Sequence, residues 1–596
     1  MPYESRAEIP ERYTWDLSSM YASDDAFLHA LGQARSYPER CLAFQGRIAH
    51  DPADLLAFLQ LDDEIGIELG KLVNYANRKS DEDTRDSTYQ DYSAQVMTLY
   101  TQIAGSQAWF SSELLTLDDA EMEAFYRRKP ELELYRRALD RIFARRAHTL
   151  SAAEEQLLAS AADMASQPEN IFSLLNDADL RFADAVDSHG ESHPVTHGSY
   201  IPLMMSTDRT LRESAYKSLY ATYRQFRNTC AATLGAQLKQ QKFYADARHY
   251  DSTLAASLDG TEVPVEVYTN LIQAVRRNLP AMHKYIEVRK QRLGLDDLRF
   301  WDLYVPVVDD VEMEFTYEEA CDLILAALEP MGPDYLALVK KGLASRWVDV
   351  YETPGKRSGA YSAGSYGTHP VICMNFQGKL DDVFTLIHEM GHSIHTYLSC
   401  ENQPAVYSDY VIFVAEVAST CNEALLTQHL LQTTDDPRKR AYVLNHFLEQ
   451  FRGTIYRQCM FAEFELRANE MTAQGRGTTA DALSEVYRQL NEDYYGAGIE
   501  VDDDIAVEWA RIPHFYYQYY VYQYATGFAA AIALSRRILT EGAPAVRDYL
   551  GFLKGGCSKT PIELLRGAGV DMASTQPIDT ALAWFDELVD EMAGLA

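Results

Sequence analysis

Long stretches of one-sided helical periodicity constrain this chain more than any other feature of its sequence. From residue 211, apolar side chains recur every three or four positions for more than seven turns, through Leu211, Ala215, Leu219, Tyr223, Phe226, Cys230, Leu234 and Leu238. This spacing is typical of an α-helix with one buried face. Similar spacing occurs at 53–78, 87–127, 151–179, 264–293, 317–345, 440–470 and 480–495. The sequence therefore predicts a mainly α-helical protein.

Strand signals are confined to two short regions. Residues 180–186 and 194–197 flank the turn DSHGES and predict a small hairpin. Residues 347–351 and 369–376 bracket a Gly/Ser-rich loop, 354–366, and predict two strands of a small sheet. The strand at 369–376 is expected to offer an exposed edge to an extended peptide, although a strand that only seals the sheet fits equally well. The loop fits either a flap with glycine hinges or a plain connection.

The length of 596 residues allows one to four domains. The predicted hairpin is the best boundary, and it separates an N-terminal helical region, 1–190, from a larger region, 191–596, that carries the motifs described below. We find no internal repeat and no low-complexity segment.

Charge and cysteine usage exclude several classes of function. The formal net charge of −34 argues against binding to a nucleic-acid backbone or to anionic lipid, because both need a surplus of Lys and Arg. The N-terminus has no basic start followed by an apolar run, and no apolar stretch approaches the roughly 20 residues that span a bilayer. The eight cysteines include no CxxC pair, which is typical of a reducing compartment. We therefore expect a cytoplasmic protein without nucleic-acid or membrane partners, of undetermined oligomeric state.

The segment 381–399 carries the clearest chemical signature. It has a helix pattern with acidic residues in its first turn, and it contains an HExxH motif formed by His388, Glu389 and His392. Histidines four positions apart lie one above the other on a helix face, so both imidazoles can reach one metal ion. Glu389, offset by about 100°, can act on a water bound to that ion. Gly391 lowers helix propensity, which is reasonable where another backbone must approach closely.

A catalytic zinc site needs a third protein ligand and one open position. His395 is a poor candidate, because a helical rise of about 10.5 Å separates it from His388, and we expect it to pack beside the site. Glu416 is a better one, because it is an acid within an apolar stretch of the next predicted helix, 410–431, where a carboxylate is costly unless paired. Glu423 shares its face and fits either a residue that orients a ligand histidine or a solvated acid.

These residue types suit peptide hydrolysis. Zinc lowers the pKa of bound water toward about 7 and polarises a carbonyl, while Glu389 can take the proton and deliver it to the leaving amine. A tetrahedral oxyanion then needs a neutral donor, and a tyrosine phenol is suitable. The tyrosine-rich run at 516–524 could supply one, although aromatic core packing is the alternative reading.

The chain resembles the thimet-oligopeptidase-type zinc metallopeptidases, and within them the oligoendopeptidase F branch. The motif HEMGHSIH at 388–395 is followed, 24 residues after His392, by Glu416 in EVAST. Five more blocks extend the likeness over nearly the whole chain: WDL at 15–17, GKRSGAYS at 355–362, HPVICMNF at 369–376, RIPHFYYQYYVYQYATG at 511–527 and PIELLRGAGVDM at 561–572. Together, and in this order, the blocks are specific.

The resemblance implies a two-lobed helical fold with a deep central channel, zinc near the channel floor, and a small β-sheet near the zinc site. It implies one Zn²⁺ per chain, bound by His388, His392 and Glu416, with Glu389 as the catalytic base. The expected activity is a zinc metalloendopeptidase that hydrolyses internal bonds of short oligopeptides by Glu-assisted attack of zinc-bound water.

Five further residues are predicted to contact substrate. The resemblance implies this for Tyr519 and Tyr522 in QYYVY, with His514 upstream, at a shorter spacing than in thimet oligopeptidase itself. These three are also expected to take part in catalysis. Gly359 and Tyr361 of the Gly/Ser-rich loop are the other two predicted substrate contacts.

Two other functions remain open from the sequence. One is a carboxypeptidase or dipeptidyl carboxypeptidase on the same helical architecture, since HEMGH followed by Glu at this distance also resembles the angiotensin-converting-enzyme group. The other is an inactive helical scaffold that binds peptides or partner proteins.

Overall fold

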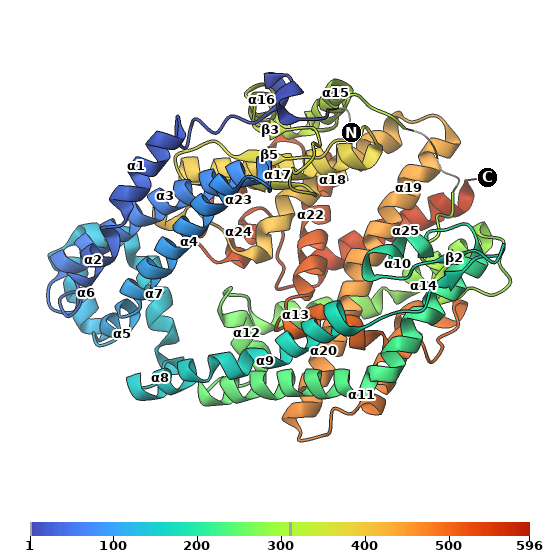
Figure 1. The fold of residues 1–596 in the computed structure, drawn as a ribbon, viewed down its shortest axis with the longest axis horizontal. Helices are drawn as coiled ribbons and strands as arrows, with labels where there is room; N and C mark the ends of the chain where they lie inside the picture. The colour runs from blue at the N-terminus through green and yellow to red at the C-terminus, as the bar shows by residue number, and fades with distance from the viewer. Residues whose placement is uncertain (1–2, 309–310, 312, 596) are drawn as a thin grey trace. The chain divides into compact units, whose positions relative to one another are not determined.

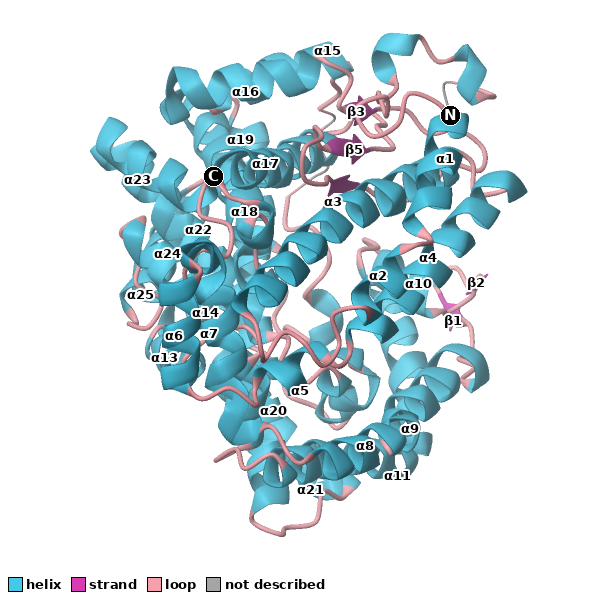
Figure 2. Ribbon diagram, turned by 90° about the vertical axis from the view of Figure 1, so that its left-hand side faces the viewer, coloured by secondary structure: helices cyan, strands magenta, loops and turns pink. Residues whose placement is uncertain are grey.

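The computed structural model describes residues 3–308, 311 and 313–595, and most of them are helical (Figure 1). The strands in the described residues are short and few (Figure 2). The prediction of a mainly α-helical fold is confirmed.

The chain folds into two compact units that interleave along the sequence. Unit 1 comprises Met1–Thr149, Glu312–Leu426 and Leu534–Gly569, and unit 2 comprises Leu150–Val311, Thr427–Ala533 and Val570–Ala596. The helices α18 (Ile412–Thr433) and α22 (Tyr522–Glu541) each contribute residues to both units. The expected division of the chain near residue 190 stays a prediction.

Unit 1 combines N-terminal helices with the central part of the chain. Its helices are α1 (Asp24–Ala34), α2 (Tyr37–Leu42), α3 (Pro52–Glu82), α4 (Ser87–Gln107), α5 (Phe110–Leu114), α6 (Asp119–Arg128), α7 (Arg136–Ala144), α15 (Tyr317–Ala327), α16 (Gly332–Ala344), α17 (Leu380–Asn402), α23 (Ala543–Leu553) and α24 (Pro561–Gly567). Asp51 caps α3 by accepting the Ala53 N–H, and Pro52 occupies its first position, as is common at helix starts. One apolar core extends from these N-terminal helices to Val371 and Cys373.

A three-stranded sheet lies within unit 1. Its strands are β3 (Val348–Asp349), β4 (Tyr361–Ala363) and β5 (Val371–Cys373), in the order β3-β5-β4. β5 pairs parallel with β3 and antiparallel with β4, which sets Ser362 opposite Ile372. The two predicted strands are therefore confirmed. The expectation of an exposed edge at 369–376 is wrong, because β5 is central and β4, inside the predicted loop, takes the edge.

Unit 2 is built around α11 (Arg209–Ala247), the long helix expected from residue 211 onward. Its other helices are α8 (Ala152–Ser160), α9 (Ala162–Ser173), α10 (His197–Met204), α12 (Thr253–Asp259), α13 (Val265–Arg277), α14 (Leu279–Arg292), α19 (Pro437–Phe451), α20 (Arg457–Ala473), α21 (Ala480–Tyr495) and α25 (Gln576–Gly594). The predicted hairpin is present as β1 (Ala185–Val186) and β2 (Ser192–His193). β1 lies inside the expected 180–186, but the expected second strand, 194–197, is wrong because β2 ends before it and α10 begins at His197.

Prolines divide some of the periodic stretches. The stretch 317–345 contains two α-helices, because Pro330 and Pro333 lack the N–H that would continue α15 into α16. The stretch 264–293 is divided between α13 and α14 at Asn278, and Pro280 occupies the first turn of α14. Among the described residues, no helix is both long and apolar enough to cross a membrane.

Candidate metal centre

Two helices of unit 1 hold the predicted metal ligands. α17 spans the expected 381–399 and carries His388, Glu389 and His392, while α18 carries Glu416. A Cβ on Gly391 would lie 2.6 Å from the Ser419 Cα, so the backbones of α17 and α18 could not come this close with any larger residue. This confirms the expectation that Gly391 accommodates a neighbouring backbone. The close approach places Glu416 beside the two histidines.

Three donor atoms converge with the spacing that a metal ion requires. The Nε2 atoms of His388 and His392 lie 3.1 Å apart, and Glu416 Oε2 lies 3.3 Å from the first and 3.5 Å from the second. Ligand atoms bound to zinc at about 2.0–2.1 Å in tetrahedral directions are separated by roughly 3.3 Å. The donor set therefore fits zinc in distance and in chemistry. His395 is not part of this group.

Glu423 fixes the orientation of His388. Its Oε1 lies 2.5 Å from His388 Nδ1, so Nδ1–H donates to the carboxylate and the Nε2 lone pair faces the donor cluster. Burial lowers the pKa of His388, but hydrogen bonds to Glu416 and Glu423 outweigh it and raise the pKa to about 10. Two carboxylates around one imidazole make this a site that favours a cation.

Glu389 lies beside the donor triplet but is not part of it. Its side chain belongs to the same turn of α17, is 7% exposed, and lies outside the donor triplet. Burial raises the pKa of Glu389, and the neighbouring His388 and His392 only partly oppose that rise. A carboxylate with a raised pKa is better suited to accept a proton near neutral pH.

Sequence reasoning missed a buried asparagine that joins the two helices. Asn422 Nδ2 donates to the Ile387 carbonyl of α17, and Asn422 Oδ1 accepts from Tyr335 OH of α16 at 3.0 Å. The side chain is fully buried and lies next to Glu423 in sequence. The only signal in the sequence was a polar residue within the apolar stretch that forms α18.

The donor group opens into a pocket of about 440 Å³ within unit 1. Residues 360–364, which include β4, form one wall, and Tyr410 lies on another. Tyr410 stacks on the buried His395 at 3.8 Å between ring centroids, so His395 packs beside the pocket as expected. Tyr361 lines the pocket but its phenol donates to Asp81 at 2.5 Å. Gly359 has φ +83° and its carbonyl accepts from Asn375 Nδ2.

The remaining predicted residues belong to unit 2. Tyr519 and Tyr522 are 2% and 1% exposed, the Tyr519 hydroxyl lies 2.9 Å from Thr253 Oγ1, and both rings contact Tyr268. His514 is half-buried within a ring cluster, with centroids 5.7 Å, 6.5 Å and 5.9 Å from those of Tyr517, Tyr520 and Tyr524. The structure thus places the two predicted donor phenols in buried positions.

Comparisons with known proteins give a consistent result. A model described as Peptidase family M3 matches residues 202–584, and one described as Oligopeptidase F matches residues 113–182. Oligopeptidase PepF of Bacillus subtilis is 44% identical, over 99% of this chain and 88% of its own. Group B oligopeptidase PepB of Streptococcus agalactiae is 40% identical, over 99% of this chain and 98% of its own.

Solved structures agree with the relatives. Oligoendopeptidase-F from Enterococcus faecium is 37% identical, with a TM-score of 0.74 over 96% of this chain and 98% of that one. A crystal structure from Chlamydophila abortus is 36% identical, with a TM-score of 0.94 over 100% of both chains.

Proposed function

Because this chain belongs to peptidase family M3, as a metallopeptidase of the oligopeptidase F type, we propose that it is a zinc endopeptidase that hydrolyses internal bonds of short oligopeptides. The observation that carries the proposal is the convergence of His388, His392 and Glu416 within 3.5 Å, with the buried Glu389 beside them. One Zn²⁺ per chain would be held by these three residues, and a catalytic zinc with three protein ligands keeps a fourth position for water or substrate.

Zinc, when bound, supplies a lowered pKa for water and a polarised substrate carbonyl. The protein's own part is to hold and move a proton. Glu389 takes the proton of the attacking water and delivers it to the leaving amine, a role that its raised pKa supports. Glu423 keeps the Nδ1–H tautomer of His388, so that Nε2 stays available as a ligand.

The edge strand β4 supports a sequence-tolerant mode of peptide binding. Ile372 N–H donates to Trp347 O on the side of β3, so Ser362, opposite Ile372, turns its N–H and C=O away from β5. A substrate in extended form pairs with this outer edge by main-chain hydrogen bonds. Because these hydrogen bonds involve only the main chain, binding depends little on which side chains the substrate carries. Tyr361, the first residue of β4, and Gly359, which precedes the strand, are the proposed substrate contacts here.

Tyr519, Tyr522 and His514 are retained as the proposed substrate and oxyanion contacts. A phenol stays protonated at neutral pH and can donate to a developing oxyanion. The support for these three residues is the resemblance of the run at 511–527, whereas the burial of both phenols favours a packing role. Kinetics of Tyr522→Phe separate the two, because loss of a transition-state contact lowers kcat with little change in KM.

Location in the cytoplasm is part of the proposal. All eight cysteines are unpaired, which is typical of proteins from reducing compartments. The bacterial relatives are named as oligopeptidases, which supports a role in peptide turnover.

An internally quenched peptide that is blocked at both ends tests the function. An endopeptidase cleaves it, and chelation of the metal abolishes the cleavage. An exopeptidase leaves the peptide intact because it needs a free C-terminal carboxylate. A scaffold protein leaves it intact and also contains no stoichiometric zinc.

A further inference from the structure

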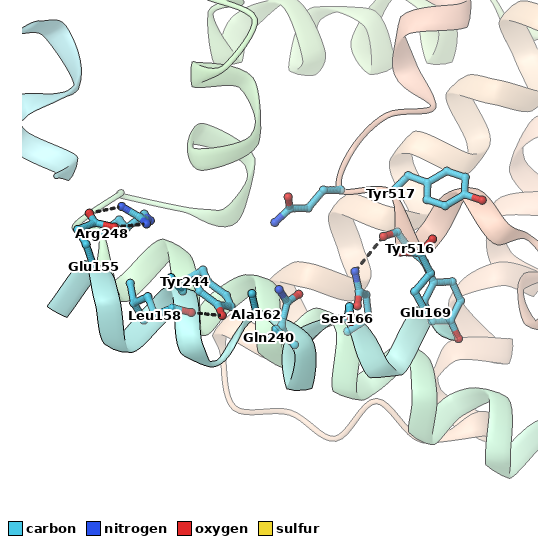
Figure 3. Close-up of a pocket in the computed structure, with 14 residues that line it drawn as sticks. Glu155, Leu158, Ala162, Ser166, Glu169, Gln240, Tyr244, Arg248, Tyr516 and Tyr517 are labelled. Carbon is cyan, nitrogen blue, oxygen red and sulfur yellow. Dashed lines mark hydrogen bonds and ion pairs between the residues drawn. The ribbon is translucent and has the colours of Figure 1, made fainter. Parts of the chain in front are cut away.

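We call the pocket of about 440 Å³ beside His388, His392 and Glu416 the metal pocket. Unit 2 contains a second pocket, of about 610 Å³, that shares no residue with the metal pocket. It lies between α8, α9, α11 and the residues 516–518 (Figure 3). Glu155 and Arg248 mark one end, where two N–O contacts of 2.8 Å form a bidentate ion pair. Tyr516 and Tyr517 mark the other end. We call this pocket the α11 trough.

The α11 trough has the length and floor of a site for an extended chain. Gln237, on α11, and Arg248, which directly follows the last residue of α11, both line the trough; they are eleven residues apart, about 16 Å along the helix axis. Extended peptide rises about 3.3 Å per residue, so about five residues fit this length. Part of the floor consists of Ala159, Ala162 and Ala165, whose small side chains leave room for those of a ligand.

The wall formed by α11 presents buried acceptors without donors. Gln237 is 7% exposed, and its Nε2 donates to the Tyr516 carbonyl at 2.8 Å, which fixes Oε1 as the free acceptor. Among the described residues, neither Gln237 Oε1 nor Gln240 Oε1 has a hydrogen-bond partner. The two residues are three positions apart and therefore lie on one face of α11. A buried acceptor is costly when unpaired, so this wall favours a ligand that brings N–H donors.

The far end of the trough is rigidly built. Gln518 and Tyr519 have φ values of +53° and +55°, which residues other than glycine rarely adopt. Their backbone is held from outside, because Ser257 Oγ donates to Gln518 O and Glu465 Oε1 accepts from Tyr519 N, both at 2.6 Å. Such strain is retained where a segment must be presented in one conformation. Here it holds the side chain of Gln518 at the trough.

We propose that the α11 trough is a second binding site for oligopeptides, which takes an extended segment of about five residues. Both glutamine side chains turn their oxygens, which are buried without a ligand, toward main-chain N–H groups of the peptide, and the alanine floor accepts its side chains with little selection. The lining carries two negative charges, on Glu155 and Glu169, and one positive charge, on Arg248. Its net charge is therefore negative, and we expect acidic peptides to bind most weakly. The ligand class follows from the proposed function, but the site itself is distinct from the metal pocket.

Photo-crosslinking locates the site directly. The probe is a nonapeptide that carries benzoylphenylalanine, and the protein is the full zinc-loaded chain with Glu389→Gln, so that the probe is bound without turnover. We expect adducts on peptides from 155–169 or 237–248, and we expect Ala162→Trp, which fills the trough, to reduce them at least fivefold. Adducts confined to other regions, or unaffected by Ala162→Trp, would overturn the proposal.

Single substitutions in the trough, tested with the same crosslinking probe, provide the second arm. Gln240→Ala and Gln237→Ala are expected to reduce the adducts on 155–169 and 237–248 about tenfold. Gln225→Ala, an exposed glutamine on α11 that does not line the trough, is the matched control and should behave as wild type. Equal adduct yields in all variants, with folding verified by circular dichroism, would contradict the proposal. Cleavage of the end-blocked quenched peptide by the protein with Glu389 intact would show that the proposed function stands regardless.

Discussion

At the scale of single residues, Glu389 is the side chain on which the proposed chemistry depends most. Glu389→Gln preserves the shape of the side chain and leaves the donor triplet intact, so we expect the variant to keep its zinc. General-base catalysis contributes about 10²–10⁴ in rate, and kcat should fall by at least that factor. Elemental analysis and kcat on one preparation check both parts. A variant that retains more than a tenth of wild-type turnover would refute the assignment of the base.

Glu423 gives a second prediction at this scale. Its contact with His388 Nδ1 orients a proposed ligand, and loss of such a partner typically weakens metal binding 10–100-fold. We expect Glu423→Gln to raise the Kd for zinc by that factor in competition titrations against a chromophoric chelator. Glu401→Gln changes an exposed glutamate near the C-terminal end of α17; it is the control variant and should leave Kd unchanged. Equal affinity in the two variants would remove Glu423 from the site.

The residues of the candidate metal centre were predictable to different degrees. The spacing of His388 and His392 could be interpreted because helix geometry alone brings residues i and i+4 together. Glu416 could be proposed because a carboxylate in an apolar stretch needs a partner. Asn422 could not, because its importance depends on which carbonyl of α17 lies opposite, and only the packed structure provides that.

At the scale of elements, the crossing of α17 and α18 determines whether the donors meet. A Cβ at residue 391 would lie 2.6 Å from Ser419 Cα and 2.9 Å from Ala418 O, and backbone atoms cannot rotate away. We expect Gly391→Ala to destabilise unit 1 by about 1–3 kcal/mol or more and to weaken zinc binding. Thermal unfolding and zinc titration measure the two effects.

Gly66→Ala is the matched control for this prediction. Gly66 lies within α3, and a Cβ there would meet no atom within 4 Å. Replacing a glycine in a helix interior by alanine is favourable by up to about 1 kcal/mol. If both variants raised the melting temperature, the close approach of α17 and α18 would not exist.

The elements themselves differ in how well a sequence defines them. The expected helices 381–399 and 410–431 agree with α17 and α18 to within three residues, because their apolar periodicity is strong. The strand β4 was missed because three residues cannot display an alternating pattern. Its position also depends on β5, which lies further along the chain. The order of the strands in the sheet could not be predicted either, and 369–376 was therefore wrongly assigned as an edge strand.

At the scale of the whole molecule, charge controls stability in acid. Burial would raise the pKa of Glu508 and Glu449, but flanking arginines lower both values to about 2, against about 4.3 in an unfolded chain. Groups with a depressed pKa in the folded state stabilise it fully above pH 4.3, and this stability is lost as the pH falls toward 2. In addition, 88 acidic residues repel one another near neutral pH.

These two effects predict a maximum in stability. Surface carboxylates, with pKa values near 4, begin to bind protons below about pH 6, which relieves repulsion, so the melting temperature should rise as the pH falls from about 6 toward 5. Below about pH 4 the buried glutamates bind protons on unfolding and the melting temperature should fall steeply. Scanning calorimetry from pH 3 to pH 8 checks the shape of the curve. A melting temperature that keeps rising down to pH 3 would exclude the role of the buried pairs.

The interleaving of the two units is a property that local sequence patterns cannot indicate. Each crossing between units at 426–427 and 533–534 falls inside a helix, α18 or α22, and carries no turn or linker signal. The expected boundary near residue 190 rested on a hairpin, which is a local feature. Packing between segments that are distant in sequence determines the units, so they emerge only from the structure.

The central claim, that one zinc ion held by His388, His392 and Glu416 is required for cleavage of internal peptide bonds, has a direct test. Metal-free protein is titrated with Zn²⁺ while the cleavage rate of the end-blocked quenched peptide is recorded. The account predicts no cleavage without zinc, a rate that rises linearly with added zinc, and a plateau at one zinc per chain. Cleavage by the metal-free protein would contradict the account. So would a Glu416→Ala variant whose cleavage rate levels off at the same zinc concentration, and at the same value, as that of the wild-type protein.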